Sequence, residues 1–180
     1  MIPFLSFYTP TYKRPAALAA CMASVAKQTE VQRVEHVIVA DYVGLGIAGM
    51  YAQVPDYAEA LHGEYVHLLA DDDVLANPSV VAQVLDFSRS EGAPPIILVD
   101  VLKNGMHIGG NWPPVEGRID LGCLIVRRDI WMRHCFDYGK RYEGDFDMAR
   151  AMARAGHRTA RLPLVFLTGG VGRGVPESVS

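Results

Sequence analysis

The sequence predicts a single α/β domain built on a mostly parallel sheet with helices on both faces. Its 180 residues fit the usual range of roughly 100 to 200 residues for one domain. Short apolar runs that stop abruptly alternate with segments of helical spacing, which is typical of parallel sheets with crossover helices. The composition, 50% hydrophobic and 21% charged, is that of a globular protein and excludes general disorder, collagen-like repeats and coiled coils.

Three apolar runs in the first half are expected to form strands: residues 4–8, 37–40 and 65–69. The first run ends in a loop at Pro10, and the third stops at Asp71. Runs that are apolar throughout are typical of strands buried on both faces, as in a parallel sheet. The carboxyl ends of these strands should therefore meet at one edge of the sheet.

Helices are expected between the strands. Pro15 suits the first turn of one helix. The inward stripe of that helix should consist of Leu18, Met22 and Val25. Asn77 provides an N-cap for a second helix that continues to about residue 91. Residues 44–63 are rich in glycine and favour a loop or an irregular helix.

The second half of the chain has a different pattern. Asn104-Gly105 is the dipeptide that most easily gives the two positive φ angles of a tight hairpin, so a small antiparallel excursion is expected there. Three further elements are expected: a strand at 121–126, a helix that begins at 144 and a strand at 161–167. The domain should span residues 1–168, followed by a flexible, Gly-rich tail at 169–180.

Charge, cysteine content and hydropathy argue against several classes of protein. A net charge of −3 disfavours a protein that grips nucleic acid or anionic membrane through its global field. The three cysteines are odd in number and widely spaced, so neither a disulfide framework nor a zinc knuckle is indicated. No apolar run reaches the roughly 18 residues of a membrane span. We therefore expect a cytoplasmic chain without a membrane span.

The strongest functional signal is the run Asp71-Asp72-Asp73, directly after an apolar strand. Open α/β sheets bind ligands at the edge where such strands end. Neighbouring carboxylates repel one another unless a cation or hydrogen-bond donors intervene, and Mn²⁺ or Mg²⁺ would satisfy them with oxygen ligands. The alternative is an ordinary turn, where aspartate is common. Asp41 ends another strand at the same edge, and it is either a turn residue or a ligand of a base or ribose.

Four segments occur in a fixed order along the chain: residues 9–15, 37–41, 63–73 and 144–147. In that order they resemble the signature of the GT-A glycosyltransferases, and most closely that of the large family-2 group. The resemblance extends in register from near residue 4 to about residue 167 of this sequence. The resemblance implies a single Rossmann-like GT-A domain. It further implies metal-dependent transfer of a sugar from a nucleotide-diphosphate sugar, with UDP as the best nucleotide, to an acceptor hydroxyl.

The same resemblance implies roles for individual residues. The donor would be held by Thr9, Pro10, Thr11, Arg14 and Asp41. The D-x-D element corresponds to Asp71 and Asp73: Asp73 would ligate the metal directly, and Asp71 would contact ribose or a metal-bound water. Asp72 should point away from the site. A cation between two phosphates stabilises the negative charge that develops as the glycosidic bond breaks, which agrees with this assignment.

The acceptor hydroxyl needs a base, and by the resemblance this is Asp145, at the start of a late helix. Direct displacement with such a base would invert the anomeric centre. An N-capping role for Asp145 is the alternative, and Glu143 is the neighbour that could replace it as base. Asp147 should instead form a surface pair with Arg150.

Acceptor-side residues are expected near Trp112 and Asp120. The Trp112 face could stack on a sugar or a nucleobase, or it could anchor a loop. Asp120 resembles a family position near the acceptor, and a strand-start turn is its alternative. The acceptor itself stays open among a glycan, a small molecule and a modified nucleic acid. The short chain could also use a second copy of itself, as a homo-oligomer, to complete the acceptor surface.

Two other functions fit the same residues. A nucleotidyltransferase uses similar topology and metal carboxylates but attacks a phosphate. It usually has a Gly-rich basic loop after the first strand, which residues 9–14 lack. The other alternative is a non-catalytic nucleotide-binding domain of the same fold.

Overall fold

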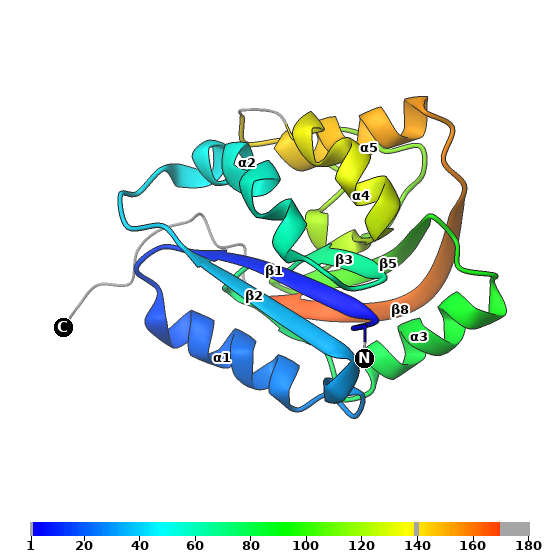
Figure 1. Ribbon diagram of the computed structural model, residues 1–180, viewed down its shortest axis with the longest axis horizontal. Helices are drawn as coiled ribbons and strands as arrows, with labels where there is room; N and C mark the ends of the chain where they lie inside the picture. The colour runs from blue at the N-terminus through cyan, green and yellow to red at the C-terminus, as the bar shows by residue number, and fades with distance from the viewer. Residues whose placement is uncertain (1, 139–140, 170–180) are drawn as a thin grey trace.

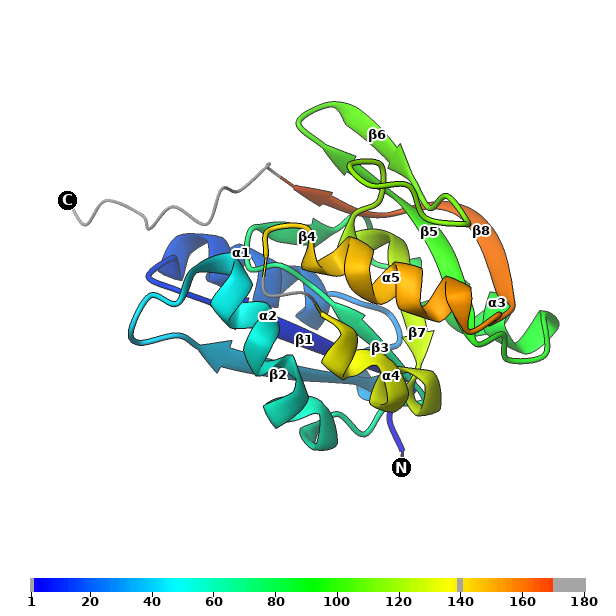
Figure 2. The same ribbon diagram turned by 90° about the horizontal axis from the view of Figure 1, so that it is seen from above.

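The computed structural model describes residues 2–138 and 141–169. The strands in these residues are β1 (Leu5–Thr11), β2 (Val34–Ala40), β3 (Tyr65–Leu68), β4 (Asp73–Leu75), β5 (Ile96–Lys103), β6 (Met106–Gly109), β7 (Leu124–Arg127) and β8 (Thr159–Gly169). They form one sheet in the order β2-β1-β3-β7-β5-β8-β4, and β6 pairs with β5 (Figures 1 and 2). β1 runs parallel to β2 and β3, and β5 runs parallel to β8, whereas β4, β6 and β7 pair antiparallel with their neighbours.

Helices cover both faces of this sheet, as the sequence predicts. They are α1 (Pro15–Ala26), α2 (Gly46–Tyr57), α3 (Val80–Ser90), α4 (Arg128–His134) and α5 (Gly144–Arg154). Helices α1 and α3 lie on one face, and α2, α4 and α5 lie on the other (Figure 1). The α/β fold class is therefore confirmed. None of the helices in the described ranges has the length and hydropathy of a membrane span.

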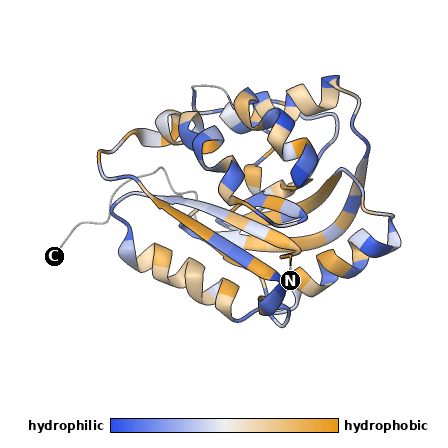
Figure 3. Cartoon of the chain, in the orientation of Figure 1, coloured by the Kyte–Doolittle hydropathy of each residue, from blue (hydrophilic) through white to orange (hydrophobic). Residues whose placement is uncertain are grey.

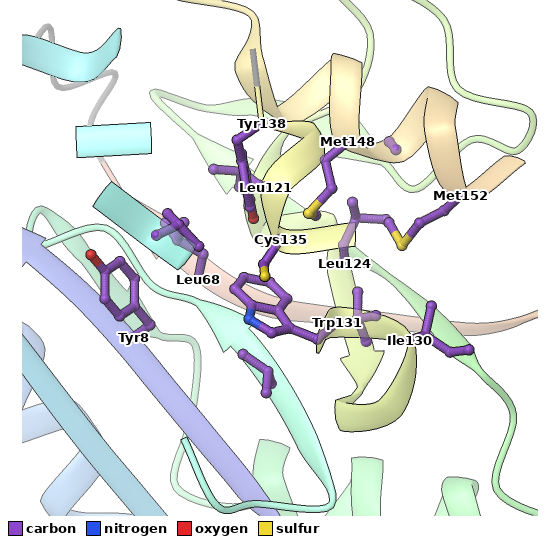
Figure 4. Close-up of a cluster of buried hydrophobic side chains, with 14 of the residues drawn as sticks. Tyr8, Leu68, Leu121, Leu124, Ile130, Trp131, Cys135, Tyr138, Met148 and Met152 are labelled. Atoms are coloured by element: carbon purple, nitrogen blue, oxygen red, sulfur yellow. The ribbon is translucent and has the colours of Figure 1, made fainter. Parts of the chain in front are cut away.

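Each face has its own hydrophobic core. Under α2, α4 and α5, Trp131 and Tyr138 pack with residues such as Leu68 and Met148 (Figure 4). Under α1 and α3, the core includes Phe7 and the apolar side of α3. Along α3 this side alternates with polar residues, as Figure 3 shows, because helical spacing turns every third or fourth side chain inward.

The hairpin around Asn104-Gly105 forms as predicted. Both residues have positive φ angles, 49° and 75°, and they join β5 to β6. Figure 2 shows this hairpin extending from one side of the sheet. The antiparallel part of the sheet extends beyond the hairpin, because β7 also runs antiparallel to its neighbours β3 and β5.

Some local predictions need correction. Met22 is 44% exposed and is not part of the inward stripe of α1, because the alanine-rich helix packs through Cys21 and Val25. The expected strand at 121–126 begins with a 3-10 turn, Leu121–Cys123, before β7. In the glycine-rich region, where a loop or an irregular helix is expected, the chain forms the helix α2, which has Pro55 inside it. Gly169 is the last residue of β8, and the remainder of the expected tail, 170–180, lies outside the described residues.

The topology brings several chain segments to one edge of the sheet. Parallel pairing sets Thr11 beside Ala40, so β1 and β2 end together. The register of β5 with β8 sets Lys103 beside Gly169, and antiparallel pairing sets Gly169 beside Asp73. The carboxyl ends of β1, β2, β5 and β8 thus lie along the same edge as the start of β4.

Candidate functional site

A pocket of about 320 Å³ lies at this edge, between the end of β1 and helix α2. It is lined by Pro10, Tyr12, Arg14, Asp41, Gly46, Ile47, Ala48, Met50, Asp71 and Tyr142. Four of the residues that the sequence predicted for donor binding are among them: Pro10, Arg14, Asp41 and Asp71. Pro10 and Asp71, which are 61 positions apart in the sequence, therefore meet in one hollow.

Asp71 is held in place by two predicted donor-site residues. The Thr11 hydroxyl donates to Asp71 Oδ2 at 2.8 Å, and Arg14 Nη1 lies 2.6 Å from Oδ1. Asp71 is only 4% exposed. Burial raises the pKa of Asp71 above its usual value, although Thr11 and Arg14 act in the opposite direction. The carboxylate is therefore fixed in orientation, with both oxygens engaged.

Asp72 does not point away from the site, contrary to the sequence expectation. Its Oδ2 lies 3.0 Å from Arg14 Nη2, so one guanidinium pairs with two consecutive aspartates. The reason is that strand alternation stops at Leu68 and a turn follows, so neighbouring side chains need not face opposite directions.

Asp73 pairs with Lys103, a residue that the sequence analysis did not select. Lys103 Nζ lies 3.0 Å from Asp73 Oδ2 and also 3.0 Å from Asp120 Oδ2. Asp73 is 1% exposed, and its Oδ1 is buried without a hydrogen-bond partner in the structure. Burial raises the pKa of Asp73 to about 7, against the opposing effect of Lys103.

Asp120 belongs to an acidic cluster at this edge, which consists of Asp71, Asp72, Asp73, Asp120 and Asp145, and it also binds the local backbone. Its side chain accepts a hydrogen bond from the Gly122 backbone N–H at 2.8 Å and caps the turn at Leu121–Cys123. The turn role and the position beside the site are therefore compatible, because different oxygens face Gly122 and Lys103.

Asp145 is the second residue of α5, and its Oδ1 accepts a hydrogen bond from the Phe146 backbone N–H at 2.7 Å. Burial raises the pKa of Asp145 to about 6, with a further contribution from the negative charge of Asp120. A carboxylate with such a pKa is ionised at neutral pH and remains basic enough to take a proton. Asp145 also acts electrostatically on Tyr51 of α2, so α2 and α5 face the same space.

Asp41 has a structural role that the sequence left open. Its carboxylate accepts hydrogen bonds from the backbone N–H groups of Val43, Gly44 and Leu45, at 2.9, 2.8 and 2.6 Å. Burial raises the pKa of this carboxyl, but the three hydrogen bonds outweigh it and leave the pKa below the usual value. Asp41 thus shapes the loop that leads into α2 while it lines the pocket.

None of the other predicted site residues, Asp73, Asp120 and Asp145 included, is among the residues that line the pocket. Thr9 is fully buried, and its hydroxyl lies 2.9 Å from His36 Nε2 rather than in the pocket lining. Trp112 is half-buried against the core under α2, α4 and α5, as a loop anchor would be. Glu143 precedes α5 and forms a partly exposed ion pair with Arg141 at 3.4 Å. Asp147 forms the predicted pair with Arg150, at 3.1 Å, and a second pair with Arg141.

The chemistry of the cluster suits a divalent cation. Carboxylate oxygens are the preferred ligands of Mg²⁺ and Mn²⁺, and such ions are commonly bound through one or two carboxylates plus substrate phosphates. The buried Oδ1 of Asp73, which has no hydrogen-bond partner, is a carboxylate oxygen of this kind. Within the described ranges no set of three or more potential ligands is close enough to hold an ion by itself.

Comparisons with known proteins agree with the fold. The sequence matches no protein-family model and no curated protein. Among solved structures, Staphylococcus aureus TarS 1-349 in complex with UDP-GlcNAc matches with a TM-score of 0.67 and 17% identity, over 96% of this chain and 60% of that chain. The UDP complex of TarS matches with a TM-score of 0.64 and 13% identity, over 94% of this chain and 61% of that one.

A third match is A197 from STIV, with a TM-score of 0.59 and 14% identity, over 94% of this chain and 87% of that chain. This chain spans about three fifths of the TarS structures. TarS is a glycosyltransferase of the GT-A family, so the GT-A fold that the sequence resemblance implied is confirmed. At these identities the likeness concerns the fold.

Proposed function

We propose that this chain is a glycosyltransferase that transfers a sugar from a UDP-sugar to an acceptor hydroxyl. The observation that carries the proposal is the pocket at the carboxyl edge of the sheet, where Arg14, Asp41 and Asp71 meet within one hollow. The fold is that of enzymes such as TarS, which binds UDP and UDP-GlcNAc. We infer that the nucleotide of the donor occupies this pocket.

Different residues of the pocket would bind different parts of the donor. Arg14 is anchored by Asp71 and Asp72 and would offer positive charge beside the diphosphate. Asp71, fixed by Thr11, would contact ribose. Pro10 and Ile47 form apolar parts of the lining and would contact the base.

A cation would complete the site. Mn²⁺ or Mg²⁺ would be held by Asp73 directly and by Asp71 through water, and it would stabilise the negative charge of the departing diphosphate. The uncompensated charge of the carboxylates favours such an ion, because an anionic diphosphate would otherwise approach a negative cluster.

Asp145 would act as the general base. It would accept the proton of the acceptor hydroxyl while the hydroxyl oxygen bonds to the anomeric carbon and the bond to the diphosphate oxygen breaks. This direct displacement would invert the anomeric centre. Asp145 lies in the same electrostatic cluster as Asp120 and Lys103, which supports its place beside the reacting atoms.

The test is release of UDP from UDP-GlcNAc in the presence of Mn²⁺, with water as acceptor. We expect the wild type to release UDP and Asp145→Asn to lower the rate by about a hundredfold or more, with little change in UDP affinity. Asp86→Asn, which changes an exposed aspartate of α3, should behave as wild type. Binding of UDP without any release would favour a non-catalytic domain, and release of pyrophosphate from UTP would favour a nucleotidyltransferase.

A further inference from the structure

Lys103 occupies a central position in the acidic cluster. It is the last residue of β5, and its side chain is only 12% exposed. Its ammonium group bridges Asp73 and Asp120 at equal distances of 3.0 Å. A buried lysine that bridges two carboxylates neutralises charge that the interior would otherwise disfavour.

The cluster still holds more carboxylates than the cations that pair with them. Among the described residues, the cluster consists of Asp71, Asp72, Asp73, Asp120 and Asp145, and the cations that pair with its members are Arg14 and Lys103. Lys103 therefore holds Asp73 in place and leaves negative charge for a further cation to balance. An ion bound at Asp73 would lie close to the Lys103 ammonium, and like charges at such distances repel strongly.

We propose that Lys103 is the resident counter-ion of Asp73, and that it competes with the divalent cation so that the ion binds together with the nucleotide rather than before it. The proposal rests on the proposed function, because it takes the diphosphate as the group that recruits the ion. The diphosphate adds negative charge and oxygen ligands, which shifts the balance from the ammonium to the ion. Lys103 can then remain paired with Asp120, its second partner.

The test is Mn²⁺ binding in the absence of nucleotide, measured from the electron paramagnetic resonance signal of free Mn²⁺. We expect Lys103→Met to bind Mn²⁺ at least about tenfold more tightly than wild type, because the competing charge is gone. Lys103→Arg keeps the charge and should stay within about threefold of wild type. Lys27→Met, at an exposed lysine at the end of α1, should equal wild type.

Thermal melts show which variants are folded. If Lys103→Met does not fold, Lys103→Gln takes its place, and we expect it likewise to bind Mn²⁺ more tightly than wild type. Equal Mn²⁺ affinity in wild type and the folded neutral variant would overturn the proposal. A similar gain in Lys103→Arg would also overturn it, because the effect would then not arise from charge. Wild type that fails to bind UDP at saturating Mn²⁺ would defeat the proposed function, whereas the comparison without nucleotide would still decide the role of Lys103.

Discussion

At the scale of single residues, the aspartates of the sheet edge differ in their partners. Asp71 is fixed by Thr11 and Arg14, and Asp73 by Lys103. Burial raises the pKa of Asp145 to about 6, and the Lys103 charge opposes this only as a minor effect. The environment of each aspartate, rather than its residue type, therefore distinguishes the proposed base, Asp145, from the proposed metal ligands, Asp71 and Asp73.

The raised pKa of Asp145 predicts a rise in activity with pH. Asp145 must be ionised to accept a proton, so the rate of UDP release should fall about tenfold per pH unit below the pKa of about 6 and level off above pH 7. The measurement is the initial rate between pH 5 and 8 at saturating donor and Mn²⁺, because a bound cation would keep Asp73, whose pKa burial raises to about 7, in its ionised form. A rate that is flat across this range would remove Asp145 from the role of base.

Asp73 and Asp72 should respond differently to amide substitution. Asp73→Asn removes the proposed direct metal ligand, and we expect donor turnover to fall by about a hundredfold or more. Asp72→Asn removes only one of the ion pairs of Arg14, and the loss should stay below about tenfold. Equal losses in two folded variants, compared by their rates of UDP release, would contradict the D-x-D assignment.

At the scale of elements, the site depends on where strands end. The sequence predicted the ends of β2 and β3 to within one residue, because each apolar run stops at an aspartate-containing turn. It ended β1 too early, because β1 continues through Pro10 to Thr11 by pairing with β2. The structure brings Pro10, Asp41 and Asp71 to one pocket. The sequence could not predict the position of Lys103. The carboxyl end of β5 reaches Asp73 only through the pairing of β5 with β8 and of β8 with β4, which are contacts between distant segments.

The loop between β2 and α2 is a second element whose role can be tested. Asp41 accepts hydrogen bonds from the backbone N–H groups of Val43, Gly44 and Leu45. Gly44 has a φ of +76°, and a Cβ at this position would come within 2.8 Å of the Tyr12 ring. Asp41→Ala leaves these donors without their partner, so we expect the free energy of unfolding to fall by about 1–3 kcal/mol. Chemical denaturation measures this change.

Asp41→Asn is the matched comparison, because it keeps one oxygen acceptor and should destabilise the protein less than Asp41→Ala. Since the pKa of Asp41 is below its usual value in the folded protein, its contribution is present above the unfolded pKa and is lost as pH falls through the folded value. A loss in Asp41→Ala that is unchanged at low pH would contradict this account.

At the scale of the whole molecule, the order of elements was predictable and the fine geometry was not. Alternating apolar runs and helical segments predicted an α/β sheet covered on both faces, because those patterns depend on local spacing. The exposure of Met22 and the direction of Asp72 depend on how α1 packs and how the chain turns after β3, and spacing does not encode these contacts. Four short segments in order nevertheless indicated the fold that the TarS structures share.

Occupation of the pocket by the nucleotide is tested most directly by calorimetric titration of UDP, with Mn²⁺ present, into wild type and Ala48→Trp. Ala48 lines the pocket on α2, so an indole there should fill the hollow and abolish measurable UDP binding while the thermal melt stays cooperative. Ala19→Trp, at an exposed position of α1 on the opposite face, should bind UDP as wild type does. We predict UDP binding in wild type and Ala19→Trp and its loss in Ala48→Trp; unchanged binding in a folded Ala48→Trp, or none in wild type, would contradict the account.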